Sequence, residues 1–473
     1  GRVIRILERG LESPRPAEVL HCLRLMEEAE HPRLKESLLR LADHPDPAVR
    51  SGVYGVMERS ADASVVPFLA ARLEREENGC RGDLLKALGA AGRTGVSDVL
   101  QRAFASSQGS ARHGALVAVV RYGGAGADHP AVRELDRLAR SDVPAERAAV
   151  AQALGEIGGP HAVAGLEPLL GDADASVRRA AIGAAGRVGD LRLLGLVVRS
   201  LEVPELRPDA VRALLLSPEV ASSALVEAYQ AAGSSRSLRR LVLQALGRSR
   251  EPEAVPFLVG ELAFAERQVL SDVLWSLHLC GFHAAGPDRN LVEKCFREEV
   301  RRGSLLVSAR RDLRGEPGAE LLVAALGQEL GRTQRRIFLL LSFVHDSEAL
   351  LRIWSNFGIS PALRDLSLEL FESRVDRAHA RSALPVLAEL AGGTPVPARE
   401  QLRRIAGRAR PRYGAWIRAC AVDAFASQPE ALAGDERTAL LTDEDELVRE
   451  TARARWTGDT GGSPLPVVDR VRV

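Results

Sequence analysis

Histidine and cysteine are the side chains best suited to metal chemistry, and three of them lie close together in the sequence. His278, Cys280 and His283 fall within one short segment. A zinc site requires further ligands at similar spacing, and this segment supplies none. The five cysteines are scattered, with no two closer than fifteen residues, which is unlike a disulfide or zinc framework. We therefore predict no metal, no cofactor and no disulfide.

Motifs for catalysis are also missing from the sequence. It has no HExxH pair, no Gly-x-Ser-x-Gly turn, no Walker A loop and no GxGxxG loop between a strand and a helix. Residues 123–126 are rich in glycine but lack a preceding strand and a following Lys-Ser pair, so we interpret them as a loop. The sequence predicts no catalytic residue, although distant residues can still form a nucleophile–base pair in a fold.

Arginines gather in the stretch 301–336 and could contact phosphates. Arg310, Arg311, Arg335 and Arg336 are the candidate partner-binding residues of this stretch. The alternative interpretation is a solvated helix face, with glutamates nearby to neutralise the arginines. The whole chain has 64 basic and 63 acidic residues and a formal net charge of +1. It therefore lacks the basic excess typical of nucleic-acid-binding proteins.

Asp and Arg residues also recur in a motif that repeats along the chain. Its clearest copy runs from Asp172 to Arg178, with the sequence Asp-Ala-Asp-Ala-Ser-Val-Arg. The arginines at 50, 81 and 112 are 31 residues apart, and the same step separates 147 from 178 and 418 from 449. A period of about thirty residues with two helices per unit indicates a helical solenoid.

We predict structural roles for these repeated residues. The aspartates should cap the second helix of each unit through its free backbone N–H groups. The arginines should reach the acidic turn of a neighbouring unit. The residues concerned are Asp46, Arg50, Arg81, Arg112, Arg147, Asp172, Asp174, Arg178, Asp209, Arg212, Arg239, Arg418, Asp445 and Arg449.

Composition and periodicity favour an all-α fold for the elements that carry these residues. Hydrophobic residues make up 46% of the chain but aromatic residues only 4%, and the apolar mass is Leu, Ala and Val rather than the residues of a large sheet. Residues 162–170 show the i, i+3, i+4 spacing of an amphipathic helix. Alanines and glycines at 180–186 allow close helix packing. We predict an α-α superhelix of roughly a dozen helix pairs.

The Asp-x-Asp-x-x-Val-Arg motif resembles the HEAT repeat, in particular the short bacterial variety also seen in bilin-lyase-type proteins. The resemblance covers roughly residues 1–270 and 400–456. It implies a HEAT-type fold and a scaffold that binds protein partners. Two enzymatic classes share this architecture, the bilin lyases and the alkylpurine DNA glycosylases, and we regard a HEAT-type lyase or glycosylase as the less favoured alternative. The tryptophans are dispersed and the charge is neutral, which does not match the basic, aromatic face of such glycosylases.

A second resemblance concerns residues 329–372, 416–421 and 443–452. These segments are similar to the HEAT region that, in certain large bacterial proteins, links an ATP/ADP-carrier-like transporter to a cyclic-nucleotide-binding domain. The resemblance implies a regulatory or linking module that is part of a larger transporter or sensor polypeptide. The module would be cytoplasmic, or the cytoplasmic part of a membrane protein, and tethered to a membrane domain without inserting into the bilayer. Its apolar runs, such as Ile337–Leu341, are far shorter than the ~20 residues of a membrane span.

We therefore predict four regions and one main function. The regions are a regular solenoid at 1–280, irregular helical repeats at 281–400, C-terminal repeats at 401–456, and a linker or tail at 457–473. The predicted function is that of a non-catalytic protein-interaction scaffold. The alternative is a nucleic-acid-binding HEAT protein that uses the arginine-rich stretch 301–336.

Overall fold

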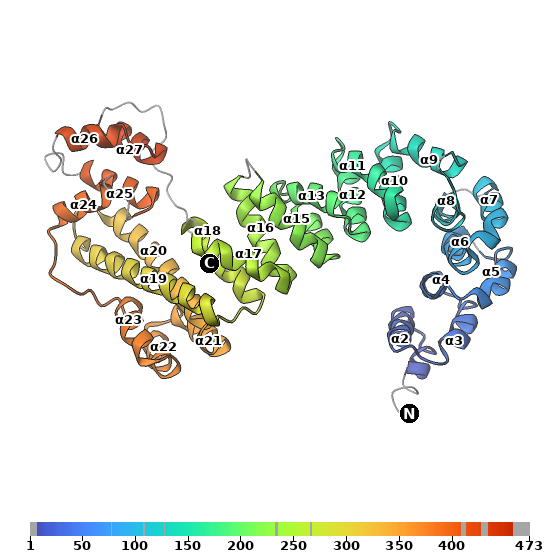
Figure 1. The fold of residues 1–473 in the computed structure, drawn as a ribbon, viewed down its shortest axis with the longest axis horizontal. Helices are drawn as coiled ribbons and strands as arrows, with labels where there is room; N and C mark the ends of the chain where they lie inside the picture. The colour runs from blue at the N-terminus through green and yellow to red at the C-terminus, as the bar shows by residue number, and fades with distance from the viewer. Residues whose placement is uncertain are drawn as a thin grey trace. The chain divides into compact units, whose positions relative to one another are not determined.

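A computed structural model describes residues 7–456, apart from 77, 107–108, 127, 232–234, 265–266, 408–412 and 427–433. Every regular element in these residues is a helix, and they contain no strand. The predicted all-α fold is confirmed (Figure 1). The predicted tail at 457–473 lies outside the described residues. The chain divides into two compact units, Gly1–Glu251 and Pro252–Val473.

The first unit is a series of antiparallel helix pairs preceded by α2. Its α-helices are α2 (Pro16–Glu28), α3 (Leu34–Leu41), α4 (Pro47–Ser60), α5 (Val66–Arg72), α6 (Asn78–Gly92), α7 (Ser97–Ser106), α8 (Gly109–Tyr122), α9 (Pro130–Ala139), α10 (Pro144–Ile157), α11 (Gly159–Leu170), α12 (Ala175–Val188), α13 (Leu191–Arg199), α14 (Arg207–Leu214), α15 (Pro218–Gln230) and α16 (Arg236–Ser249). Short 3-10 helices lie at Ala63–Val65 (η1), Arg93–Val96 (η2) and Ser200–Glu202 (η3).

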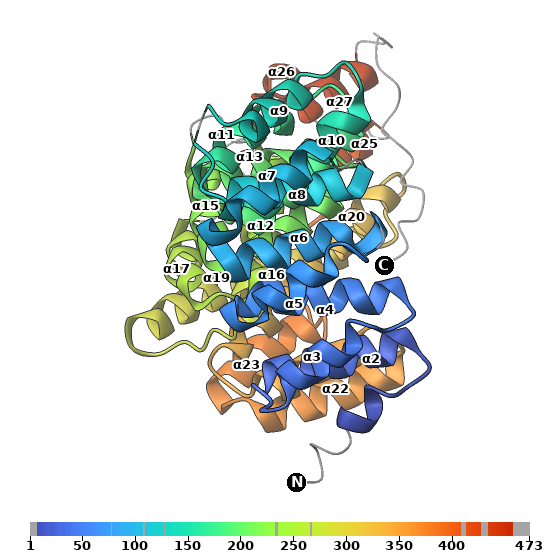
Figure 2. The same ribbon diagram turned by 90° about the vertical axis from the view of Figure 1, so that its right-hand side faces the viewer.

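The second helices of successive pairs stack on one another in this unit. Helices α4, α6 and α8 pack in one row (Figure 2), and α12 likewise packs between α10 and α14. Small residues allow this packing because a side chain would collide with the neighbouring helix. A Cβ placed on Gly114 of α8 would lie 2.2 Å from the backbone of Gly82 in α6. Each pair thereby buries an apolar face that it could not bury alone.

Aspartates begin several of the second helices, as the motif predicts. The Asp46 side chain accepts a hydrogen bond from the backbone N–H of Ala48 at 2.8 Å. Asp174 accepts one from the N–H of Ser176 at 2.7 Å. These bonds satisfy backbone donors that have no partner inside the helix.

The second unit starts with a short 3-10 helix and contains two long helices, α19 and α20. It begins with the 3-10 helix η4 (Pro252–Ala254). Its α-helices are α17 (Val255–Phe264), α18 (Arg267–Leu279), α19 (Gly286–Leu313), α20 (Glu320–Ser342), α21 (Ser347–Phe357), α22 (Pro361–Arg374), α23 (Arg377–Leu387), α24 (Ala398–Ala406), α25 (Ala415–Ala426), α26 (Gly434–Leu441) and α27 (Glu446–Trp456).

Three helices of this unit form an insertion in the repeat. Helix α20 packs against α18 and also against α25, which packs in turn against α27. The row of second helices therefore passes from α20 directly to α25. Helices α21, α22 and α23 leave this row and return to pack against α19 and α20 (Figure 1). This insertion explains why the repeat motif fades between 281 and 400.

An aromatic cluster anchors the insertion to α20. The ring of Phe338 lies 5.3 Å from that of Phe371 in α22 and 5.6 Å from that of Phe357 in α21. Trp354 packs against both Phe338 and Phe357. Such ring pairs stabilise a core beyond their burial alone.

The boundaries predicted between the four regions remain predictions. Their positions can be compared with the bounds of the helices. The boundary at 280/281 lies between α18 and α19, inside the second unit. The boundary at 400/401 lies within α24. The structure instead places a division between the units at 251/252.

Candidate functional site

Three of the repeat arginines form ion pairs with the acidic turn of the next repeat. Arg147 donates from Nε and Nη2 to the two carboxylate oxygens of Asp172 at 2.7 and 2.8 Å. Arg418 binds both oxygens of Asp443, with its Nη2 at 2.5 Å from Oδ2. Arg50 pairs with Glu76 at 3.1 Å. These bidentate or buried contacts connect successive helix pairs.

Other repeat arginines bind the turn that precedes their own helix. Arg178 donates to the backbone carbonyl oxygen of Asp172, six residues earlier, at 2.7 Å. Arg449 does the same with the carbonyl of Asp443 at 2.6 Å. These bonds satisfy carbonyl oxygens in the turn between the two helices of a pair.

The structure corrects the assignment at Arg212. In that repeat, Arg207 donates to the carbonyl of Leu201, six residues earlier, at 2.8 Å. Arg212 is 73% exposed and pairs with Asp209 three residues before it. Helix α14 already begins at Arg207, so Arg212 lies too far along the helix to reach the turn, and Asp209 lies inside the helix and not at its cap.

The remaining repeat residues have individual environments. Arg112 donates to the carbonyl of Phe104 at 3.1 Å and lies over its ring. Arg239 lies over the ring of Tyr229. Arg81 is half-buried in α6. Asp445 accepts from the backbone N–H of Leu447 at 3.0 Å and caps α27.

Two carboxylates of the clearest repeat, Asp172 and Asp174, have lowered pKa values. The hydrogen bonds from Arg147 lower the pKa of Asp172, and those from Ser176 lower the pKa of Asp174. Opposite charges and donated hydrogen bonds favour the ionised carboxylate in this way. Both aspartates are therefore engaged in hydrogen bonds within the fold.

Several arginines of the arginine-rich stretch make contacts inside the second unit. Arg336 is only 3% exposed and donates to Glu299 at 2.7 Å. It also contacts Glu329, which in turn accepts from Arg302 at 2.8 Å. The resulting network joins α19 to α20. Arg336 is therefore not available to a partner, contrary to its candidate role.

The other three candidate arginines have different surroundings. Arg310 pairs with Glu389, between α23 and α24. Arg311 pairs with Asp312 at 2.7 Å and donates to the carbonyl of Gly393 at 3.2 Å. Arg335 is exposed, and its guanidinium lies 5.1 Å from the ring centre of Trp275. The four arginines thus do not form one solvent-facing basic surface.

An open hollow of 640 Å³ borders this stretch. Arg311, Asp312, Arg403 and Tyr413 are among its lining residues. Arg311 and Asp312 are paired with each other, and Arg403 lies 3.3 Å from Glu436. Three charged residues of the lining are therefore engaged in ion pairs.

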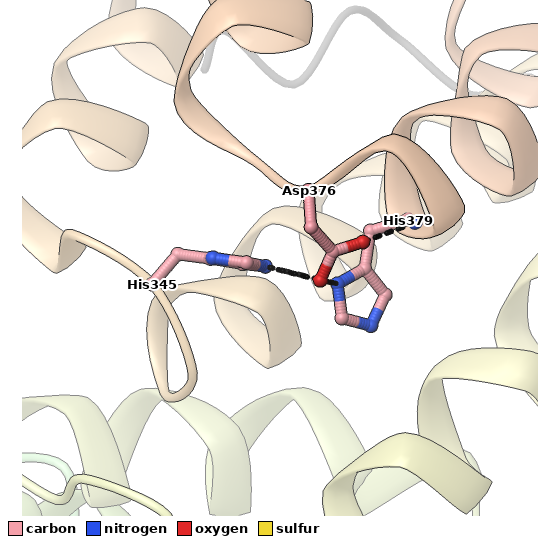
Figure 3. A group of neighbouring side chains, drawn as sticks. All are labelled: His345, Asp376 and His379. Atoms are coloured by element: carbon pink, nitrogen blue, oxygen red, sulfur yellow. Dashed lines mark hydrogen bonds and ion pairs between the residues drawn. The ribbon is translucent and has the colours of Figure 1, made fainter.

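Metal-ligand side chains do gather at one place, but not at His278, Cys280 and His283. In the described part of the chain, the group whose ligand atoms lie within 4.8 Å of one another is His345, Asp376 and His379. Figure 3 shows the three side chains pointing toward a common point. We name them the histidine–aspartate cluster.

Two elements of the insertion supply the cluster. His345 lies in the turn after α20, and Asp376 begins α23 as its N-cap. The Asp376 Oδ1 atom accepts from the backbone N–H groups of Ala378 and His379, which leaves Oδ2 facing the histidines. His379 Nδ1 lies 2.8 Å from Asp376 Oδ2 and 2.9 Å from His345 Nε2. His345 Nε2 lies 3.8 Å from the same carboxylate oxygen.

A fourth residue orients the buried histidine. The Nε2 atom of His379 lies 3.0 Å from Glu293 Oε2 of α19, and Phe296 packs edge-on against the imidazole ring. Burial, followed by the charge of His379, lowers the pKa of His345. The backbone N–H of His379 lowers the pKa of Asp376.

Sequence patterns could not find this cluster by spacing alone. Asp376 and His379 are three residues apart at a helix start, but His345 is 34 residues before His379. Only the packing of α23 beside the α20–α21 turn brings them together. The prediction of no metal therefore rested on local motifs, and it gave no weight to this pair.

Exposed apolar residues concentrate on helix α22 and the turn before it. Ile359, Leu366 and Leu370 are 66%, 50% and 43% exposed. Their acidic neighbours Asp365, Glu369 and Glu372 are exposed as well. We name these six residues the α22 face. Leu366 and Leu370 lie four residues apart and so share one side of the helix.

Comparisons with known proteins give the following likenesses. Residues 133–215 match a family model described as HEAT repeats. No curated protein matches the chain. Human deoxyhypusine hydroxylase in complex with glycerol is 18% identical, with a TM-score of 0.28, over 59% of this chain and 96% of the hydroxylase. Importin beta is 11% identical, with a TM-score of 0.27, over 96% of this chain and 79% of importin beta. The karyopherin Kap121p, bound to the extreme C-terminus of the protein phosphatase Cdc14p, is 10% identical, with a TM-score of 0.32, over 95% of this chain and 62% of the karyopherin.

The matched segment contains the most regular part of the first unit. It runs from within α9 through α14 and includes the Arg147–Asp172 ion pair and the Asp174 cap. The same stacking of second helices continues on both sides of it. The described part of the chain is thus all-helical, and its residues 133–215 match HEAT repeats.

Proposed function

We propose that the chain is a non-catalytic scaffold whose α22 face docks a protein partner. The observation that carries this proposal is the exposure of Ile359, Leu366 and Leu370 beside three exposed carboxylates. Neighbouring apolar side chains at a helix surface are typical of partner contacts. The acidic edge favours a partner helix with an apolar side and basic residues next to it.

The polar residues of the repeat support the same conclusion by elimination. Arg147, Arg418 and Arg50 are paired within the fold, so they have structural contacts of their own. The α22 face has both apolar area and charge that the fold does not use.

Photo-crosslinking in cells tests the proposal. A photoreactive amino acid at 366 or 370 should yield a discrete crosslinked product, because the partner would cover these positions. The matched control is position 216, where Leu216 is also 56% exposed but lies in the first unit. The absence of a product from 366 and 370, or the same products from all three positions, would contradict the proposal.

We infer further that the module acts within a larger transporter or sensor polypeptide of bacterial type, on its cytoplasmic side. The similarity of residues 329–372 and 416–421 to the transporter-linked HEAT region supports this inference. No helix among the described residues combines the length and apolarity needed to cross a bilayer. An immunoblot of fractionated cells from the source organism tests it. A band well above 50.9 kDa in the membrane fraction would support the inference, and a soluble band near that mass would contradict it.

Nucleic-acid binding through 301–336 is less well supported than protein binding. Arg336 is buried and Arg310 and Arg311 are paired, so few free charges remain to displace phosphate counterions. We expect no mobility shift of duplex DNA at low salt. A salt-dependent shift that disappears when Arg310, Arg311 and Arg335 become Ala would favour nucleic-acid binding instead.

A further inference from the structure

We propose that His345, Asp376 and His379 bind a divalent zinc-type metal ion that fastens the α21–α23 insertion to α19 and α20. Two imidazole nitrogens and one carboxylate oxygen are the donor set of three-ligand zinc sites, which leave a further position to water. The inference rests on side-chain geometry and is independent of the α22 face.

Proton positions around His379 show why a cation fits. Glu293 Oε2 lies 3.0 Å from Nε2, so Nε2 donates to it, and Nδ1 presents its lone pair to the cluster when His379 is neutral. That lone pair faces the carboxylate of Asp376 at 2.8 Å. Two atoms approach this closely only with a proton on Nδ1 or with another positive charge beside them. A metal ion supplies that charge to all three ligand atoms at once.

The distances between ligand atoms suit a small first-row ion. Donors about 2.0–2.1 Å from a tetrahedral zinc ion lie roughly 3.3 Å from one another. The three distances here are 2.8, 2.9 and 3.8 Å. Movements of about half an ångström, within the rotamer freedom of Asp376 and His345, would equalise them.

The surroundings match the requirements of a bound metal. Glu293 holds His379 through its second nitrogen, which is the usual partner arrangement of a metal-bound histidine. The His379 side chain is 8% exposed and that of His345 is 14% exposed, whereas that of Asp376 is 48% exposed. The ion would therefore reach the site from the Asp376 side and keep solvent at its remaining position. The carboxylates of Asp376 and Glu293 offset its charge.

The site also has a clear mechanical consequence. His345 lies at the end of α20, while Asp376 and His379 begin α23 and Glu293 lies on α19. A bound ion would connect these three elements at the edge of the insertion. We expect hydrogen exchange at 345–346 and 376–380 to slow when the metal binds.

Zinc and cobalt titrations of the full chain test the proposal. The protein is prepared without a histidine tag and stripped with a chelator, and Zn²⁺ is then titrated in competition with a chromophoric chelator. We expect one ion per chain, and the visible absorption of tetrahedral cobalt on titration with Co²⁺. Asp376→Asn, which keeps the helix cap, and His345→Ala should abolish this binding. His161→Ala, at an exposed histidine in the first unit, is the matched control and should bind like wild type.

A further variant keeps the test decisive even if the ligand variants fold poorly. Glu293→Gln removes no ligand atom and should weaken zinc binding by about 10- to 100-fold, with unchanged circular dichroism. Absence of stoichiometric binding to wild type would overturn the proposal. Equal binding to wild type, Asp376→Asn and Glu293→Gln would also overturn it, because the ion would then bind elsewhere.

Discussion

Arginine side chains carry most of the long-range polar contacts of the fold, and they do so in two ways. Along the repeat, Arg147 and Arg418 connect one helix pair to the next through a carboxylate. In the second unit, Arg336 joins α19 to α20 through a buried network with Glu299. In both settings the planar guanidinium donates several hydrogen bonds in a fixed fork, a geometry that the lysine ammonium lacks.

Removing Arg336 should destabilise the protein strongly. The Arg336→Ala variant leaves Glu299, itself 5% exposed, as an unpaired buried charge, and such a loss costs about 3–5 kcal/mol. The free energy of unfolding from denaturant titration measures this cost. Arg332→Ala is the control, since Arg332 is 69% exposed, and it should change stability by no more than about 0.5 kcal/mol. Equal stability of the two variants would show that the network contributes nothing.

The Arg147–Asp172 pair should make stability depend on pH in the acid range. The pKa of Asp172 is lower in the folded chain than in the unfolded chain because Arg147 donates to its carboxylate. Its contribution is therefore fully present above the unfolded value of ~3.9 and is lost as the pH falls through the folded value. The difference in unfolding free energy between wild type and Asp172→Asn should be larger at pH 7 than at pH 3. A difference that is the same at both values would contradict this role.

The sequence predicted most of the repeat arginines correctly, but it could not predict where each helix begins relative to its arginine. The 31-residue step identified Arg147, Arg178 and Arg449, because each lies at a fixed offset from a turn carbonyl. At Arg212 the motif was present but the helix began earlier, at Arg207. The motif does not specify the length of the turn before the helix. The sequence therefore could not show that Arg207, and not Arg212, binds the turn carbonyl.

Helices α6 and α8 of the first unit approach each other closely at glycine residues, and substitution of a glycine can test this packing. Gly114 faces the backbone of Gly82, so no side-chain movement can make room for a larger residue. Gly183, in the middle of α12, has no atom within 4 Å of a Cβ built on it.

Alanine at these two glycines should therefore have opposite effects. Gly183→Ala should stabilise the protein by about 0.5–1 kcal/mol, since alanine favours the helix. Gly114→Ala should destabilise it by about 1–3 kcal/mol, since overpacking forces α6 and α8 apart. Thermal melting of both variants measures the signs, and a stabilised Gly114→Ala protein would contradict the close approach of these helices.

The sequence could not predict that α21–α23 form an insertion in the repeat. Its helices have ordinary starts, with Asp346, Ser360 and Asp376 as caps, so they look like further repeats. Whether α20 stacks on the next helix or on α25 depends on contacts between distant segments. The same long-range packing creates the histidine–aspartate cluster, which local spacing could not reveal.

At the scale of the whole molecule, the chain combines a regular first unit with a second unit that carries an insertion. Periodicity alone predicted the all-helical repeat fold, because each repeat makes the same local contacts. Function could be predicted only as a class. The α22 face depends on which side of an inserted helix stays uncovered, and that side is known only once the packing is known.

Binding of the crosslinked partner to three purified proteins tests the central claim most directly. Calorimetric titration would compare wild type with Leu366→Ser/Leu370→Ser and with Arg147→Ala. The account predicts that the double variant binds at least about tenfold more weakly, since each exposed leucine that a partner covers contributes on the order of 1 kcal/mol. It predicts unchanged affinity for Arg147→Ala, because Arg147 is paired with Asp172 within the fold. Full affinity in the double variant would show that the α22 face does not contact the partner. Loss of affinity in Arg147→Ala would show that partner binding depends on the repeat arginines.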